Sequence, residues 1–343
     1  MSKRLQEKKS WIPYVFIVAM LHVIGILFLI LSARHHSLLY GIGFVAYTLG
    51  LRHAFDADHI AAIDNTVRKL VQQERNPTGV GFYFSLGHSS VVFIMAVILA
   101  FSVQWAETNM PQMQEIGGFI GMIVSGCFLI IIGLMNLAVL LGLFKVFLRM
   151  RHGAYDKDEV EHLLMSRGFV SRLIGPLFKF VSKSWHVYPL GFLFGLGFDT
   201  ASEVALLAVS AGAAKDHVPF LGILALPILF AAGMSMMDTA DGIFMKSAYN
   251  WAFSTPLRKV YYNLTVTVIS VAAALLIGVV ELMQVMSSKL HLHNPVWGWI
   301  NSLNLSWLGY ILVLLLLLTW GTSFIIWKFF RIERRWQQTL HRD

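Results

Sequence analysis

The sequence predicts an all-α, polytopic integral membrane protein with eight transmembrane helices. Of its 343 residues, 57% are hydrophobic and only 13% are charged, whereas an ordinary soluble domain carries about 25% charged residues. Apolar runs of about 20 residues, the length that crosses a bilayer as a helix, recur along the whole chain. We therefore expect a single transmembrane domain over residues 1–343.

Eight apolar runs are long enough to cross a bilayer as helices. They cover residues 13–31, 38–63, 79–101, 116–143, 188–212, 218–245, 261–286 and 303–327. The first run follows four basic residues, as the apolar part of a signal peptide does, but it lacks a small-residue cleavage site. We therefore expect it to be retained as the first helix.

The basic residues predict the orientation of these helices. If all eight runs cross the membrane, 23 of the 27 Lys and Arg residues fall on one side, among them Arg68 and Lys69 in the second loop. The positive-inside rule places that side, and with it both termini, in the cytoplasm. The same bias explains the net charge of +8 without a nucleic-acid partner, because the positive charge faces anionic lipid headgroups.

One long loop, residues 144–187, is expected to lie in the cytoplasm. Its charged part, residues 155–167, predicts a solvated helix. Apolar residues between Leu173 and Trp185 then recur at helical spacing, which predicts either a helix along the membrane surface or a simple linker.

The second run carries an unusual polar heptad, HAFDADH at residues 53–59, directly after Arg52. Each Arg or Asp near the middle of a membrane helix costs about 2.5 to 3.5 kcal/mol, so a polar cluster retained there indicates a functional site. Imidazole nitrogens mixed with carboxylate oxygens suit a divalent transition metal. The alternative is a packing ion pair between Arg52 and one aspartate.

Four further runs carry ionisable residues, and those on three of them extend the heptad into a larger group. The spacing of four between Asp199 and Glu203 puts both on one helix face, and the spacing of three does the same for Asp238 and Asp241. These acids would form a path for a dication or release protons when metal binds, or have a structural role. The candidate metal-site residues are His53, Asp56, Asp58, His59, His88, Asp199, Glu203, Asp238 and Asp241.

The types of ligand narrow the choice of ion. Mg²⁺ and Ca²⁺ prefer sites made of oxygens alone, so two or three imidazoles favour nickel, cobalt, zinc or copper. The single cysteine, Cys127, cannot form a paired thiolate site, which argues against Cu(I). The chain has no G-x4-G-K-[ST] phosphate loop, and we expect neither a resident cofactor nor an ATPase subunit.

Four motifs resemble the signature regions of a known transporter family. RHAFDADHI, FSLGHSSVV, LGFDTASEV and GMSMMDTADG are similar, in the same order, to those of the NiCoT-type nickel/cobalt permeases, and the resemblance covers essentially the whole chain. The H-x4-D-H core corresponds to His53, Asp58 and His59. Ser202 stands where threonine is common in the family.

The resemblance implies high-affinity uptake of nickel, cobalt or both across the cytoplasmic membrane of a prokaryote. It also implies a multi-pass secondary transporter, not an enzyme, with inward termini and a long central cytoplasmic loop. Two alternatives stay open. A membrane-embedded metalloenzyme would need motifs such as HExxH, which the chain lacks, and a metal-gated channel would use similar residues.

The membrane potential could drive such uptake without ATP. A dication moving inward gains about 4.6 kcal/mol per 100 mV, because each elementary charge contributes about 2.3 kcal/mol. Proton coupling through the carboxylates is an alternative.

The geometry of the heptad predicts a broken helix. At about 100° per residue, His53, Asp56 and His59 share an arc of about 120°, but Asp58 points about 140° away from His53. We favour a break that lets Asp58 bind the metal directly, as irregular backbone in transporters permits. In a regular helix, Asp58 would instead orient a ligating histidine or pair with Arg52.

The spacing of the motifs hints at an internal repeat. Gly50-Leu51 followed by Asp58 recurs 145 positions later as Gly195-Leu196 followed by Glu203. An odd number of helices separates the two copies, so the repeat would be inverted, as in many secondary transporters.

Overall fold

The computed structural model describes residues 10–34, 36–101, 103–151, 181–197, 201–215, 218–252, 256–292, 294–303 and 305–329. This described part is all-helical and contains no strand, which confirms the predicted class. The helices are α2 (Ile12–Ala33), α3 (Leu38–His53), α4 (Ala57–Gln72), α5 (Val80–Phe101), α6 (Val103–Arg151), α9 (Val187–Gly195), α10 (Ala201–Lys215), α11 (Phe220–Ala252), α12 (Pro256–Lys289), α13 (Pro295–Ser302) and α14 (Ser306–Phe329).

Six of the described helices are long and apolar enough to cross a membrane, namely α2, α5, α6, α11, α12 and α14. They coincide with six of the eight predicted runs. The other two runs, 38–63 and 188–212, are each divided between two shorter helices. The number of eight crossings and the orientation therefore stay predictions.

The break in the second run lies within the polar heptad. α3 ends at His53, and α4 begins at Ala57 with Asp56 as its N-cap in an extended conformation (φ −64°, ψ 142°). Aspartate is favoured at this position, and Asp58 in the first turn of α4 complements the positive end of the helix dipole. The chain thus leaves helical geometry where its polar residues are concentrated.

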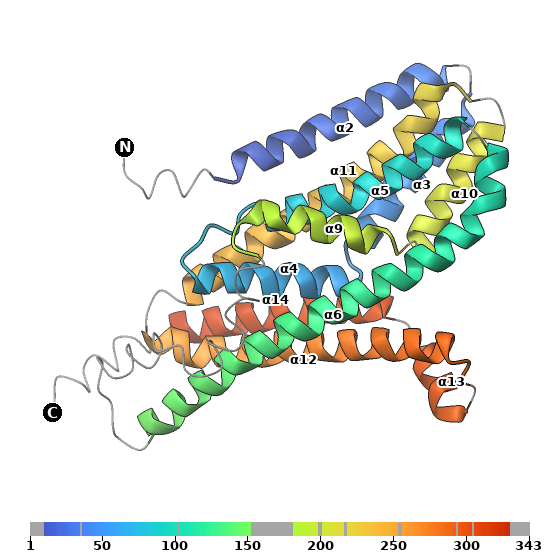
Figure 1. The fold of residues 1–343 in the computed structure, drawn as a ribbon. Coiled ribbons are helices and arrows are strands. Elements are labelled where there is room, and N and C mark those ends of the chain that lie inside the picture. Colours follow the sequence, from blue (N-terminus) through green and yellow to red (C-terminus); the bar gives the residue numbers. More distant parts are fainter. Residues whose placement is uncertain are drawn as a thin grey trace.

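The helices are arranged around α11, which packs against α2, α3, α4 and α5. In Figure 1, α2 runs along one side of the bundle, and α6, α12 and α14 lie on the opposite side. The two broken pairs, α3 with α4 and α9 with α10, lie between these sides (Figure 1). Ala54 and Asp56 in the break between α3 and α4 are buried, which places this break inside the bundle.

Close backbone contacts hold the broken helices against unbroken ones. A Cβ added at Gly50 of α3 would overlap the carbonyl oxygen of Phe230 on α11. A Cβ added at Gly195 of α9 would lie 2.7 Å from the carbonyl oxygen of His88 on α5. Only glycine lets the backbones approach so closely, and these two glycines are the pair separated by 145 positions.

The second predicted loop is shorter than expected. α4 continues to Gln72, so it includes Arg68 and Lys69, which are only 0% and 4% exposed. Their assignment to a loop was wrong, because hydropathy cannot distinguish polar residues facing the protein interior from residues facing water. In the loop over 144–187, α6 extends to Arg151. The helix expected over 155–167 lies outside the described residues. Of the apolar stretch from Leu173 to Trp185, only the end from residue 181 is described, and it contains a short 3-10 turn, Ser184–His186.

Candidate metal site

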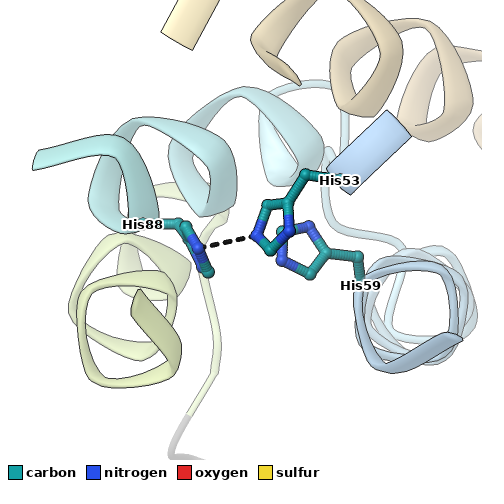
Figure 2. A group of neighbouring side chains, drawn as sticks. All are labelled: His53, His59 and His88. Atoms are coloured by element: carbon teal, nitrogen blue, oxygen red, sulfur yellow. Dashed lines mark hydrogen bonds between the residues drawn. The ribbon is translucent and has the colours of Figure 1, made fainter. Parts of the chain in front are cut away.

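Three imidazoles from three helices meet in the interior of the bundle. His53 ends α3, His59 lies in the first turn of α4, and His88 lies on α5 (Figure 2). One ring nitrogen of each lies within 4.8 Å of the others, and Nε2 of His53 is 2.8 Å from Nε2 of His88. Nitrogens that bind one metal at about 2.1 Å lie at most about 4.2 Å apart. The rings therefore need to draw together only slightly to hold one ion.

The break between α3 and α4 brings two of these rings together. His53 and His59 come from two helices joined by the short turn at residues 54–56, and their ring centroids are 4.6 Å apart. The Asp56 backbone N–H donates to the His53 carbonyl oxygen at 2.9 Å, which closes the turn. The rings of Phe84 and Phe230 contact His59 and His53 and line the apolar side of the group.

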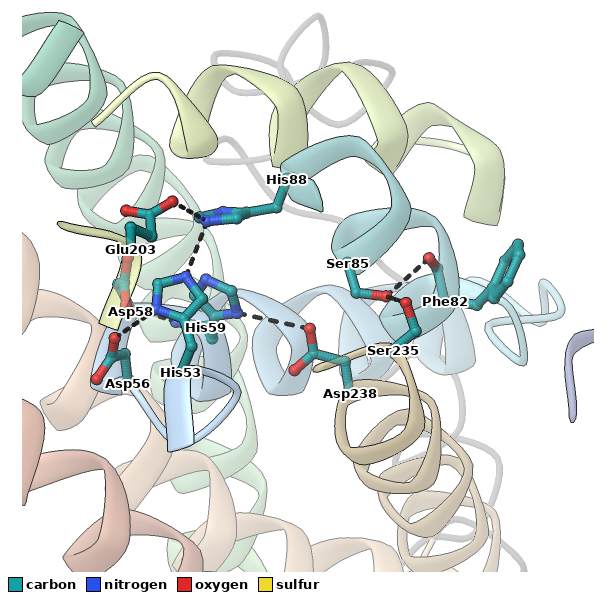
Figure 3. Close-up of polar contacts among 10 residues, drawn as sticks. All are labelled: His53, Asp56, Asp58, His59, Phe82, Ser85, His88, Glu203, Ser235 and Asp238. Atoms are coloured by element: carbon teal, nitrogen blue, oxygen red, sulfur yellow. Dashed lines mark hydrogen bonds and ion pairs between the residues drawn. The ribbon is translucent and has the colours of Figure 1, made fainter. Parts of the chain in front are cut away.

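Each imidazole faces one carboxylate, and the three carboxylates come from different elements (Figure 3). Oδ2 of Asp56 lies 2.9 Å from Nδ1 of His53. Oε1 of Glu203, on α10, lies 2.8 Å from Nε2 of His88. On the third side, Oδ2 of Asp238, on α11, lies 3.5 Å from Nδ1 of His59.

The two closest carboxylates contact their histidines at different places. Asp56 lies beside Nδ1 of His53, on the far side from the nitrogen that faces His88. A proton held on Nδ1 by this carboxylate leaves the lone pair of Nε2 for a metal. Glu203 instead contacts the same Nε2 of His88 that faces His53. Its oxygen therefore lies among the candidate donor atoms and can itself bind an ion.

Several polar atoms of the group have no hydrogen-bond partner. They include Nε2 of His59 and Oδ1 of Asp238, although both side chains are 0% exposed. A buried polar atom without a partner costs about 1 to 3 kcal/mol, and a bound ion is one of the explanations for such atoms in a native protein. The donor set thus fits a transition-metal dication.

Two hydroxyls hold α5 against α11 one turn away from the site. The Ser85 hydroxyl donates to Oγ of Ser235 at 3.0 Å (Figure 3). Ser85 precedes His88 by three residues, and Ser235 precedes Asp238 by three, so this contact fixes the register of the two helices. The same helices touch again where a Cβ at Gly81 would overlap the Asp238 carbonyl oxygen.

Three further residues that sequence analysis considered, Asp58, Asp241 and Arg52, lie within the described part of the chain. Oδ1 of Asp58 accepts the backbone N–H of His59 at 2.9 Å, and direct binding of a metal by this carboxylate stays a prediction. Asp241 lines a cavity of about 200 Å³ between α11, α14 and the turn at 54–56. Arg52 is exposed and makes no ion pair within the described part of the chain. Asp199 lies outside the described residues.

A second buried polar group was missed by sequence analysis. It consists of Asp64, Asn65 and Arg68 of α4, Asn136 of α6 and Tyr249 of α11, each 3% exposed or less. A signal was present in the sequence, because no helix breaker follows Asp58 until Asn76-Pro77. A helix extended through this stretch places Asp64 and Arg68 one turn apart.

Comparison with known proteins gives consistent matches over almost the whole chain. A family model described as "High-affinity nickel-transport protein" matches residues 39–326. The chain is 60% identical to "Nickel transporter NixA" of Staphylococcus aureus, covering 97% of this chain and 98% of that protein. It is 53% identical to "High-affinity nickel-transport protein NixA" of Helicobacter pylori, covering 93% and 97%.

A more distant relative carries a different metal in its name. The chain is 38% identical to "Cobalt transport protein NhlF" of Rhodococcus rhodochrous, covering 92% of this chain and 91% of that protein. No solved structure matches the chain.

Proposed function

Since the chain belongs to the high-affinity nickel-transport protein family, we propose that it imports nickel, cobalt or both across the cytoplasmic membrane of a prokaryotic cell. Relatives that match most of its length are named as nickel transporters, and one is named as a cobalt transport protein. The family is one of metal transporters and not of enzymes, which makes a membrane metalloenzyme the weaker alternative.

The observation that carries the proposal is the meeting of His53, His59 and His88 in the buried interior. A dication would bind Nε2 of His53, Nε2 of His88 and one ring nitrogen of His59. Glu203 would add an oxygen ligand, since it contacts the same nitrogen of His88. Asp56 would orient His53 from behind, as carboxylates beside metal-binding histidines commonly do.

The remaining acids would act before or after this binding step. Asp58 would position His59 through the backbone N–H bond instead of binding the ion. Asp238 and Asp241, one turn apart on α11, and Asp199 of the fifth run would provide an electronegative path for a dication. The metal is the transported substrate, so the protein needs no resident cofactor.

In the proposed topology, the chain crosses the membrane eight times and the metal site lies near the middle of the membrane. The six long, apolar helices would each cross as a single helix, and the pairs α3 with α4 and α9 with α10 would each cross as a broken helix. Broken helices of this kind carry the binding sites of many secondary transporters. α2 begins and α14 ends at the same end of the bundle (Figure 1), which supports termini on one side, and the basic residues favour the cytoplasm.

Transport by purified protein in sealed vesicles tests the function. We expect uptake of radiolabelled nickel or cobalt when an inside-negative potential is imposed, without ATP. His53→Ala and His59→Ala should insert normally but lose high-affinity uptake, because each removes one ligand. His22→Ala is the matched control, because His22 bonds the Val18 carbonyl oxygen and Tyr47 on α2 and α3, away from the site.

The same vesicles distinguish a transporter from a metal-gated channel. A steady current carried by abundant ions in the presence of nickel would favour the channel. Normal nickel uptake by a correctly inserted His53→Ala protein would refute the proposed site.

A further inference from the structure

Arg68 is a fully buried cation at the centre of the second polar group. Its Nη2 donates to Oδ2 of Asp64 at 3.3 Å and to Oδ1 of Asn65 at 3.2 Å. The Tyr249 hydroxyl donates to the other oxygen of Asp64, and Nδ2 of Asn136 donates to Oδ1 of Asn65 at 2.7 Å. Helices α4, α6 and α11 thus converge on one Asp–Arg pair.

This pair continues the line of acids that begins at the histidines. At a rise of about 1.5 Å per residue, Asp64 lies about 7.5 Å and Arg68 about 13.5 Å beyond His59 along α4. α11 packs beside α4 and places Asp238 next to His59 and Tyr249 next to Asp64. Between them on α11 lies Asp241.

The line leads toward one end of the bundle. In Figure 1, α4 and α11 both run from the region of the breaks toward the end where α2 begins, which is the end proposed to face the cytoplasm. An ion leaving the histidines in this direction would meet Asp238, Asp241 and Asp64 and then the guanidinium of Arg68.

The hydrogen bonds of Arg68 are too few to explain, through protein stability alone, why this charged side chain is buried. Its exposed fraction is 0%, but Nε and Nη1 have no hydrogen-bond partner, so only one of its three nitrogens is used. A buried ion pair can often be replaced by apolar residues without loss of stability. The guanidinium stays charged at any physiological pH. It therefore places a permanent positive charge on the line along which a metal dication would leave the histidines.

We propose that Arg68 is a tethered cation that closes the cytoplasmic end of the metal path. With no metal present, it neutralises Asp64. A dication that arrives beside Asp241 competes with Arg68 for the carboxylate of Asp64 and displaces the guanidinium. After the ion has left, Arg68 pairs with Asp64 again. Its positive charge then repels cations that approach from the cytoplasm. This inference rests on the proposed uptake function.

The double variant Asp64→Asn/Arg68→Gln tests the proposal, because it removes both charges together and leaves the net charge unchanged. Efflux of radiolabelled nickel is measured from preloaded vesicles with the potential collapsed, alongside steady accumulation with the potential imposed. We expect efflux to rise about tenfold and accumulation to fall. The variant removes the repulsion between the single charge of Arg68 and the double charge of the ion, and a tenfold change is modest for such a repulsion in a buried site. Nickel binding by the detergent-solubilised protein should change by less than about threefold, since no histidine contact is altered.

The control is Glu115→Gln/Lys289→Gln, which removes an exposed ion pair of 3.2 Å with the same change in charge. It should leave efflux and accumulation as in the wild type. If the Asp64→Asn/Arg68→Gln protein also behaves as the wild type, the Arg68 pair is only structural and the inference is overturned.

If the double variant fails to insert, Arg68→Lys decides, because it loses the planar fork while the neighbouring carboxylate of Asp64 favours the charged form of the lysine. Efflux within about twofold of the wild type supports the proposal, and a tenfold rise overturns it, since charge is the property claimed to matter. A wild-type protein that moves no nickel would instead remove the proposed function itself.

Discussion

At the scale of single residues, the carboxylates around the histidines differ in which nitrogen they contact. Asp56 contacts the nitrogen of His53 that points away from His88, whereas Glu203 contacts the nitrogen of His88 that faces His53. The same chemical group is therefore expected to orient a ligand in one position and to be a ligand in the other. These roles can be separated by isosteric amide substitutions.

Asp56→Asn should weaken nickel binding by about 10 to 100-fold, the usual effect of losing a carboxylate that orients a metal-binding histidine. Glu203→Gln should also remove an oxygen neighbour of the metal and reduce transport. Binding is measured by titration calorimetry and the neighbours by X-ray absorption on the metal-loaded protein. An unchanged first shell in Glu203→Gln would contradict the assignment of Glu203 as a ligand.

Asp58→Asn should have a much smaller effect. The amide oxygen of asparagine can accept the same His59 backbone N–H bond, so we expect binding within about tenfold of the wild type and unchanged metal neighbours. Asp58→Ala, which removes the acceptor, should bind more weakly than Asp58→Asn. Loss of an oxygen neighbour in Asp58→Asn would show that Asp58 binds the metal directly.

At the scale of secondary-structure elements, the two interrupted helices decide how the site is built. The break at 54–56 was expected, because a regular helix cannot direct Asp58 and His53 to one ion. The bond from the His59 backbone N–H to Asp58 was not predicted, because residue types alone do not show which carboxylate near a helix start accepts a backbone N–H of the first turn. Direct binding of the metal by Asp58 stays a prediction. Pairing of His88 with Glu203, 115 residues apart, depends on tertiary packing that no local pattern specifies.

Hydropathy identified the six unbroken helices but gave the wrong end of α4. Apolar runs report where a helix faces lipid, whereas Asp64 and Arg68 face other helices, so their polarity resembled that of a loop. The three histidines were recognisable from their residue type within apolar runs. The second polar group consists of residue types that are ordinary in loops. The absence of a helix breaker before Asn76-Pro77 could have indicated that α4 continues, but the partners Asn136 and Tyr249 follow only from the packing of α4, α6 and α11.

Gly50→Ala and Gly195→Ala test the backbone contacts of the two broken helices. Each adds a methyl group against a carbonyl oxygen of an unbroken helix, and overpacking of this kind costs about 1 to 3 kcal/mol. We expect a lower melting temperature in detergent for both variants. Gly41→Ala on α3 and Gly212→Ala on α10 are matched controls with open space around the added methyl group, and they should melt as the wild type does.

At the scale of the whole molecule, the first half of the chain, which contains α3 and α5, and the second half, which contains α9 and α11, pack against each other in a reciprocal manner. The broken helix α3 contacts α11 of the second half, and the broken helix α9 contacts α5 of the first half. This exchange is the arrangement expected of an inverted repeat, in which the substrate site lies between the repeats. His88 of the first half and Glu203 of the second half approach His53 and His59 from different sides, as this arrangement would require.

Labelling of introduced cysteines tests the proposed orientation. In a Cys127→Ser background, Lys289→Cys should react with a membrane-impermeant maleimide in intact cells, because Lys289 lies in the last turn of α12 at the proposed outer face. Arg75→Cys, at an exposed position in the turn between α4 and α5, should react only after the cells are permeabilised. The reverse pattern would invert the orientation.

The depth at which the three imidazoles are buried has a consequence for which ions can enter. His53, His59 and His88 are 1%, 0% and 3% exposed, so an ion that reaches them must shed most of its hydration shell. Mg²⁺ gives up its waters reluctantly and gains little from nitrogen donors, whereas nickel and cobalt recover the cost through imidazole bonds. Dehydration would thus discriminate against magnesium before any ligand geometry is compared.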